Sequence, residues 1–171
     1  NDFVRVLNIN TDPGLTMLQS NFVEIADVND LIVEDANAND GIHLFAGTST
    51  TGSLDLIGEV TSPNVLLQSS GGVDQDATNG VVTANQLVVG GDQIAEGTGA
   101  FIRRGQNQVD QLVGNLLNGS LQLQNMNALT ISSGLSFTGS DGAQTDAATG
   151  LFAGGDGASL AFADPNLALA N

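Results

Sequence analysis

The chain of 171 residues carries 19 acidic residues against three arginines, and its formal net charge at neutral pH is −16. A surface of that charge repels phosphate backbones and anionic lipid, so we expect neither nucleic-acid binding nor membrane insertion. Cysteine, tryptophan and tyrosine are absent from the sequence, which excludes disulfides and thiol chemistry and argues against aromatic platforms for sugars. With 41% hydrophobic residues, the chain can fold, and we expect one domain over residues 1–171.

From the N-terminus, apolar residues alternate in short groups that turn residues interrupt, which is typical of β-strands. Val4 and Val6 form the first group, and the sequence TDPG from Thr11 to Gly14 predicts a tight turn. After the short run Leu31 to Val33 comes the most polar loop of the chain, Glu34 to Gly41. We therefore expect short strands and frequent turns, with no helix.

Beyond Gly41 the alternation becomes regular, and each group places two apolar residues on one face of a strand. These pairs are Ile42/Leu44, Leu54/Leu56 and Val65/Leu67. Three similar segments start at Asn64, Asn85 and Asn107, so the pattern recurs after 21 and then 22 residues. A coil of a parallel β-helix needs about this length, so the sequence predicts an all-β solenoid with coils of about 20–22 residues.

Three further features bear on the fold. The dipeptides Asn79-Gly80 and Asn118-Gly119 favour hairpins, and they make an antiparallel β-sandwich the alternative fold. In stacked coils, asparagines such as Asn107 and Asn125 are expected to act as turn residues and to form hydrogen-bonded ladders between coils. Residues 140–171 are rich in glycine and alanine but keep short apolar groups, and we expect them to form terminal coils or a cap.

The stretch NGSLQLQNMNALTI from Asn118 to Ile131, together with Asn64 to Asp92, resembles the β-strand repeats of large bacterial exoproteins of the filamentous-haemagglutinin type. The likeness is close from Leu54 to Phe137, looser before Leu54 and poor after Gly139. It implies a right-handed parallel β-helix in a secreted or surface-displayed adhesin. It also implies an extracellular location, at the bacterial cell surface.

The sequence suggests one metal site and no other cofactor. Asp35, Asn37 and Asn39 place oxygen-bearing side chains at alternate positions, as in a calcium-binding loop, so Ca²⁺ is the one candidate ligand. The EF-hand pattern itself is not met, because Gly41 comes one residue late and Ala46 stands where that loop has a bidentate glutamate. A solvated polar turn is the competing interpretation.

The basic residues and the single histidine point to structural roles. Alternation puts His43 on the face opposite Ile42 and Leu44, where we expect it to face solvent. The pair Arg103-Arg104 is expected to form a local ion pair with Asp92, Glu96 or Asp110, or to contact a neighbouring subunit.

No residues form a catalytic constellation, so the expected function is structural, and we do not expect an enzyme. The chain is interpreted as a stiff β-helical segment of a larger secreted polypeptide, adhesin or filament. Its expected partner is further β-helix, either a flanking part of the same polypeptide or another subunit, together with glycans or a host or cell-surface receptor. The alternative is a glycan-binding or polysaccharide-active β-helix module.

Overall fold

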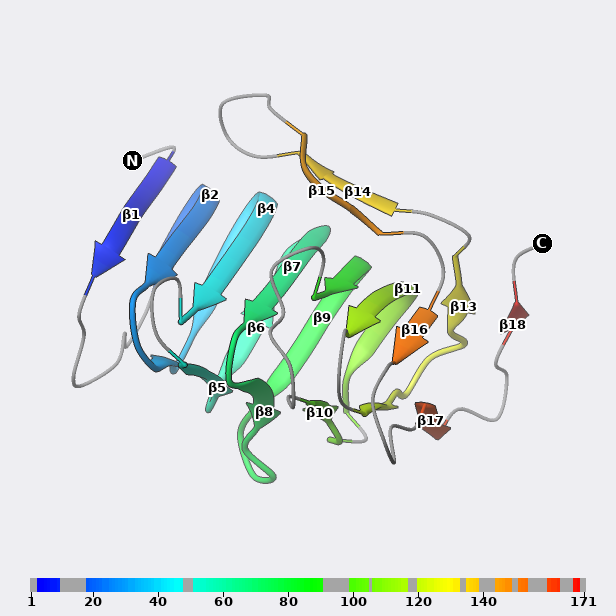
Figure 1. The fold of residues 1–171 in the computed structure, drawn as a ribbon. Helices are drawn as coiled ribbons and strands as arrows, with labels where there is room; N and C mark the ends of the chain where they lie inside the picture. The colour runs from blue at the N-terminus through cyan, green and yellow to red at the C-terminus, as the bar shows by residue number, and fades with distance from the viewer. Residues whose placement is uncertain are drawn as a thin grey trace.

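The computed structural model of the chain describes residues 3–9, 18–47, 51–90, 99–104, 106–116, 120–132, 135–138, 144–148, 151–153, 160–163 and 168–169. The regular elements of these residues are all strands, and the strands of the two large sheets pair in parallel (Figure 1). The protein is a β-solenoid, as the alternation predicted. The antiparallel β-sandwich does not hold.

The larger sheet contains ten strands, eight of which follow one another in an unbroken hydrogen-bonded order. In that order the eight are β1 (Phe3–Ile9), β2 (Leu18–Asp27), β4 (Ala36–Ala46), β6 (Glu59–Thr61), β9 (Val81–Val89), β11 (Gln108–Leu116), β13 (Thr130–Ile131) and β18 (Ala168–Leu169). Two more strands join beside them: β7 (Asn64–Ser69) pairs with β4 and β9, and β16 (Leu151–Ala153) pairs with β11. We call this the first sheet.

The second sheet contains six strands and faces the first across the core (Figure 1). Its order is β17 (Leu160–Ala163), β12 (Leu121–Gln124), β10 (Ala100–Ile102), β8 (Gly72–Gln75), β5 (Ser53–Leu56) and β3 (Leu31–Val33). Each coil thus passes from the second sheet through a corner into the first sheet. Strands β16, β17 and β18, from the segment expected to form terminal coils, extend these two sheets.

Columns of apolar side chains fill the space between the sheets, because parallel pairing in register stacks equivalent residues on top of one another. In the first sheet one such column joins Val23, Ile42, Val65, Leu87, Leu112 and Ile131. All the pairs predicted to share an inward face, Ile42/Leu44, Leu54/Leu56 and Val65/Leu67, are buried. Burial of one such side chain contributes roughly 1.5 to 3 kcal/mol, so the stacked columns carry most of the stability.

The coil length varies around the predicted value. Along the same column the steps are 19 residues from Val23 to Ile42, 22 from Val65 to Leu87 and 25 from Leu87 to Leu112. The strands are held in register while the corners absorb insertions. The three asparagine-led segments are not strictly equivalent, since Asn64 pairs with Gln86 and not with Asn85. The apolar alternation sets the register, because a slip of one residue would turn the core side chains outward.

The two Asn-Gly dipeptides do not mark hairpins in the described chain. Asn79-Gly80 lies in the turn between β8 and β9, which belong to different sheets, so it forms a corner of a coil. Asn118-Gly119 lies outside the described residues. The antiparallel pair that the structure describes is instead β14 (Leu135–Thr138) with β15 (Gln144–Ala148), a hairpin set apart from both large sheets.

Candidate functional site

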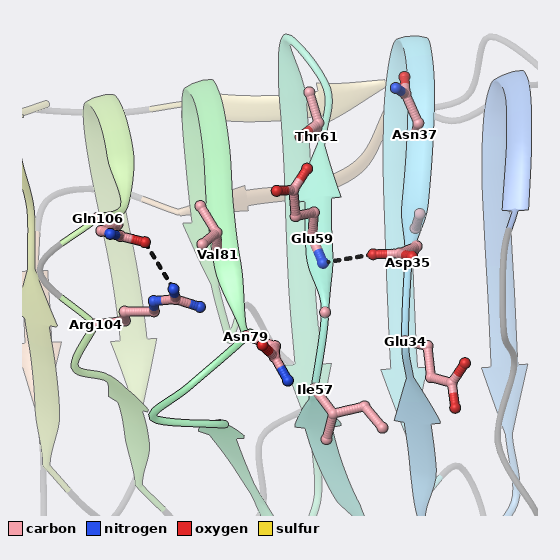
Figure 2. A pocket seen from close by; sticks show the side chains of 12 residues that line it. Glu34, Asp35, Asn37, Ile57, Glu59, Thr61, Asn79, Val81, Arg104 and Gln106 are labelled. Atoms are coloured by element: carbon pink, nitrogen blue, oxygen red, sulfur yellow. Dashed lines mark hydrogen bonds between the residues drawn. The ribbon is translucent and has the colours of Figure 1, made fainter.

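A groove of about 760 Å³ runs along one corner of the solenoid, where coils pass from the second sheet to the first. Four successive corners line it, so it crosses four coils and follows the solenoid axis (Figure 2). At about 4.8 Å between coils, the distance from the first corner to the fourth is roughly 14 Å. We call this feature the corner groove. Its lining residues are Glu34 to Asn37, Ile57 to Glu59, Thr61, Asn79, Val81, Arg104 and Gln106.

The corner groove is acidic at one end and basic at the other. Glu34, Asp35 and Glu59 come from the first two corners, and Arg104 comes from the fourth. The Arg104 guanidinium is held in place, because Nη2 donates to Gln106 Oε1 at 2.7 Å and Nη1 donates to the Gly80 carbonyl at 3.4 Å. A linear ligand lying in this groove would therefore meet opposite charges at its two ends.

The third corner is shaped by Asp76, just before the groove residue Asn79. The backbone N–H groups of Thr78 and Asn79 both donate to Asp76 Oδ1 at 2.8 Å. These two bonds hold the pKa of Asp76 below its ordinary value, and the bond from Asn79 has the larger effect. The nearby Arg104 also lowers this pKa. The ionised carboxylate thus fixes the turn that presents Asn79 to the groove.

The three residues predicted to bind calcium lie at this corner and on the adjoining strand. Asp35 precedes β4, and its Oδ1 accepts the N–H of Glu59 at 2.9 Å, on the next coil. Asn39 lies on β4 and donates through Nδ2 to Asn21 Oδ1 at 2.7 Å, on the preceding coil. Alternate residues of a strand lie about 6.6 Å apart, and calcium bonds are about 2.4 Å long. The structure therefore does not gather Asp35, Asn37 and Asn39 around one point, and calcium binding stays a prediction.

Metal-binding clusters and membrane-spanning helices are both missing from the described ranges. These residues contain no group of three or more histidine, cysteine, aspartate or glutamate side chains placed to hold a metal ion. They also contain no helix that is long and apolar enough to cross a membrane.

The prediction that His43 faces solvent is wrong. His43 lies on the outer face of β4, opposite Ile42 and Leu44 as expected, but it is only 7% exposed. Its Nε2 lies 2.6 Å from Gln68 Oε1, and its Nδ1 lies 3.9 Å from Glu24 Oε1. The His43 side chain is thus buried on the outer face of the first sheet, which the local alternation does not reveal.

The arginine pair divides between two roles. Arg103 forms the predicted local ion pair, but its partner is Asp74, with Nη2 and Oδ1 3.5 Å apart. Both side chains are more than half exposed, so this pair contributes little to stability. Asp92 and Glu96, two of the expected partners, lie outside the described residues. Arg104 instead enters the corner groove.

Asp55 lies beside Asp74 in the second sheet, where the two strands pair in register. Burial raises the pKa of Asp55, and the charges of Asp74 and Asp30 raise it further, while a hydrogen bond from Ser53 opposes the shift. A raised pKa in the folded state means that the neutral form favours folding. Stability from this group is therefore present below the ordinary pKa of 3.8 and is lost as the pH rises through the shifted value.

The Asp55→Asn variant should accordingly be more stable than the original chain at pH 7, by about 0.5 kcal/mol, and should lose this advantage below pH 3.8. Urea denaturation at pH 7 and pH 3 measures the difference. Asp110→Asn, at an exposed position of β11, is the control because it removes the same charge without relieving this contact. Equal stabilisation by both variants would show that net charge alone is responsible.

The fold and the groove together define a parallel β-solenoid with a polar groove along one corner. Comparison with protein-family models, curated proteins and solved structures finds no match to this chain.

Proposed function

We propose that the protein is a structural segment of a secreted or cell-surface bacterial protein of the filamentous-haemagglutinin type. In this proposal it is a stiff rod that joins end to end with further β-helix, either of the same polypeptide or of a neighbouring subunit. Its activity is mechanical and adhesive, and it is not an enzyme. Extracellular display suits the acidic composition, because salt outside the cell screens the self-repulsion of the chain.

The observation that supports this proposal is the open order of both sheets. Within the described chain, β1 and β18 each pair on one side of the first sheet, and β3 and β17 each pair on one side of the second. A strand at the edge of a sheet offers a row of N–H and C=O groups, and another strand can pair with it. The next coil of a β-helix is the partner of matching shape, because it repeats the register of the coils already stacked.

The edge strand β3 offers a sharp test. The Val33 carbonyl accepts the N–H of Ile57, so Val33 directs its backbone groups towards the β5 side. In a parallel ladder the adjacent residue, Ile32, directs its N–H to the opposite side, where no described strand pairs with β3. Ile32→Pro therefore removes a donor from the edge while the bonds between β3 and β5 remain, since edge strands accept proline at such positions.

Sedimentation velocity over a concentration series, combined with electron microscopy of the particles, measures the association. We expect the original chain to form elongated end-to-end species that Ile32→Pro weakens at least tenfold. Ile32→Ala is the matched control because it shortens the same side chain and keeps the N–H. A chain that stays monomeric at high concentration, or equal association of the proline and alanine variants, would contradict the proposal.

The corner groove favours a second candidate function, binding of a linear glycan. Its floor crosses four coils, and its walls offer carboxylates, amides, the Thr61 hydroxyl and the 37% exposed side chain of Ile57. A glycan array tests this function with the original chain and with Asn79→Ala, whose side chain lines the groove. Asn85→Ala is the control, at an exposed position of β9 that does not line the groove. Binding that both variants retain, or no binding at all, would exclude the groove as a glycan site.

A further inference from the structure

Two lines of side chains border the corner groove at three successive corners (Figure 2). The first line is Ile57, Asn79 and Arg104, and the second is Glu59, Val81 and Gln106. At each corner the sequence has a glycine between the two lining residues, at positions 58, 80 and 105. A Cβ atom at Gly58 would overlap the Glu34 carbonyl oxygen, and one at Gly80 would lie 2.5 Å from the Leu56 carbonyl oxygen. Gly58 and Gly80 therefore let successive corners pack closely, and they add no side chain between the two lines.

The spacing of the corners matches the spacing of sugars in a β-linked glycan. Successive coils lie about 4.8 Å apart, and each pyranose of a β1,4-linked chain advances that chain by nearly the same distance. Such a ligand presents one sugar to each corner. An extended peptide fits less well, because its side chains on one face repeat every two residues, about 6.6 Å apart. The coil repeat thus favours a glycan, and the inference that follows rests on the second candidate function, glycan binding in this groove.

The charges that the groove offers to a ligand are divided between its two ends. The exposed side chains of Glu34 and Glu59 lie at the first two corners. The Arg104 guanidinium lies at the fourth corner, where its bond to Gln106 Oε1 at 2.7 Å leaves other N–H groups for a ligand. An ammonium group is therefore attracted to the first two corners and repelled from the fourth.

The whole chain also favours a cationic sugar over an acidic one. A net charge of −16 repels uronate chains and raises the local concentration of cations. The sequence has no tryptophan or tyrosine on which a sugar ring could stack, so charged contacts must supply much of the affinity. Sugars with free amino groups meet both conditions.

We propose that the corner groove binds a linear β1,4-linked aminoglycan, with one sugar at each of its four corners. The sugars at the Glu34 and Glu59 corners carry free amino groups, which pair as ammonium groups with the two carboxylates. The sugar at the Arg104 corner is N-acetylated, and its amide carbonyl accepts a hydrogen bond from the guanidinium. Opposite charges at the two ends thereby fix the direction in which the glycan lies.

Isothermal titration calorimetry at pH 6, where the glucosamine amine is protonated, tests this assignment with three β1,4-linked tetramers. The first is N-acetylglucosamine throughout, the second is glucosamine throughout, and the third has glucosamine in the two sugars at one end and N-acetylglucosamine in the other two. We expect the third tetramer to bind at least tenfold more tightly than the first, the effect of one charged contact. Arg104→Gln should raise the affinity for the second tetramer, because it removes the repulsion at the fourth corner.

The double variant Glu34→Gln, Glu59→Gln should lose the preference for free amines and keep its binding of the fully acetylated tetramer. Asp110→Asn is the matched control, since it removes an exposed charge of β11 outside the groove and should keep the preference. Both glutamates are exposed, and urea denaturation checks that each variant folds as the original chain does.

The possible failures are distinguishable. Equal affinity for the acetylated and the half-acetylated tetramer would overturn the selection of amines and leave glycan binding intact. If none of the three tetramers binds, the glycan function fails together with this inference. A loss of preference in Asp110→Asn as large as in the double variant would show that net charge alone attracts the amine. Tetralysine that binds as tightly as the half-acetylated tetramer would overturn the assignment to a glycan, because the groove would then select charge without regard to sugar spacing.

Discussion

Replacing Asn107 by alanine is expected to lower the free energy of unfolding by about 4 kcal/mol, because several buried polar groups lose their partner at once. The Asn107 side chain is completely buried and makes five hydrogen bonds. A loss of this size is a large part of the total stability of an ordinary domain. Few single changes to this chain should have a greater effect.

The reason is that Asn107 connects three consecutive coils. Its Oδ1 accepts the backbone N–H of Val82 at 2.8 Å and the Gln75 side-chain amide at 2.7 Å, both on the preceding coil. Its Nδ2 donates to the carbonyl of Gln124 at 3.0 Å on the next coil. The side-chain amide thus continues the hydrogen-bonded ladder through a corner, where backbone groups alone do not meet.

Gln75 needs this partner because its polar side chain lies at a core position of the second sheet, where the adjacent coil has an apolar residue. It pairs in register with Leu56 in the second sheet and is only 8% exposed. A buried amide without hydrogen bonds costs roughly 1 to 3 kcal/mol. The reciprocal bonds between the Gln75 and Asn107 amides, at 2.7 and 3.1 Å, remove that cost. The two residues should therefore be strongly coupled.

Urea denaturation of Asn107→Ala, Gln75→Leu and the double variant measures both the loss and the coupling. We expect the double variant to lose at least 1 kcal/mol less than the sum of the single variants, since each single change removes the same reciprocal pair of bonds between the two amides. Asn85→Ala, an exposed asparagine on β9, is the control and should change stability by less than about 0.5 kcal/mol. A change at Asn107 no greater than at Asn85 would show that the network does not stabilise the fold.

Much of this interior was predictable from the sequence, because the stacked columns follow from simple alternation. The pairs Ile42/Leu44 and Leu54/Leu56 are buried as predicted, and asparagine side chains form hydrogen bonds between coils at Asn107 and Asn125. Asn125 uses its side chain as a strand residue would, accepting the N–H of Val109 and donating to its carbonyl. The local sequence pattern is sufficient to predict a contact that repeats from one coil to the next.

The burial of Leu66 and of His43 on the outer face of the first sheet was not predictable in the same way. Leu66 lies in the run NVLLQ, where alternation turns it outward, and nothing nearby indicates that it is covered. The β14–β15 hairpin, whose strand β14 lies against β7, begins at Leu135, far along the chain, so the contact depends on tertiary structure. The alternation correctly placed His43 on the outer face of the sheet, but it could not predict how much of the side chain is exposed.

The corner groove could be predicted from the sequence only in part. Its residues Glu34, Ile57, Asn79 and Arg104 fall one coil apart, at intervals of 23, 22 and 25 residues. That spacing is close to the coil length and could have aligned them at one corner. The depth of the groove could not be inferred, because it depends on how closely successive corners approach. Asp35 and Asn37 were singled out for calcium and lie in the groove lining.

The close approach of two corners gives the second large prediction, that Gly58→Ala lowers the free energy of unfolding by about 3 kcal/mol. A Cβ atom added to Gly58 would lie 1.4 Å from the Glu34 carbonyl oxygen and 2.7 Å from Asp35 Oδ1. The nearest of these atoms belongs to the backbone of the preceding coil and cannot rotate away. The two coils must separate at the corner, and the bond from the Glu59 N–H to Asp35 must weaken.

For a chain of this length, 3 kcal/mol corresponds to a decrease in Tm of about 9 °C, which differential scanning calorimetry resolves. Glu59→Ala is the matched control, since it alters the exposed adjacent residue and keeps the backbone N–H that Asp35 accepts. Its effect should stay within about 0.5 kcal/mol.

Because Gly58 and Glu59 both line the groove, the two variants also separate two contributions to ligand binding there. A glycan that depends on groove shape is lost with Gly58→Ala, and one that depends on the carboxylate is lost with Glu59→Ala. A Gly58→Ala variant as stable as the original chain would show that the coils do not meet as closely as the geometry requires.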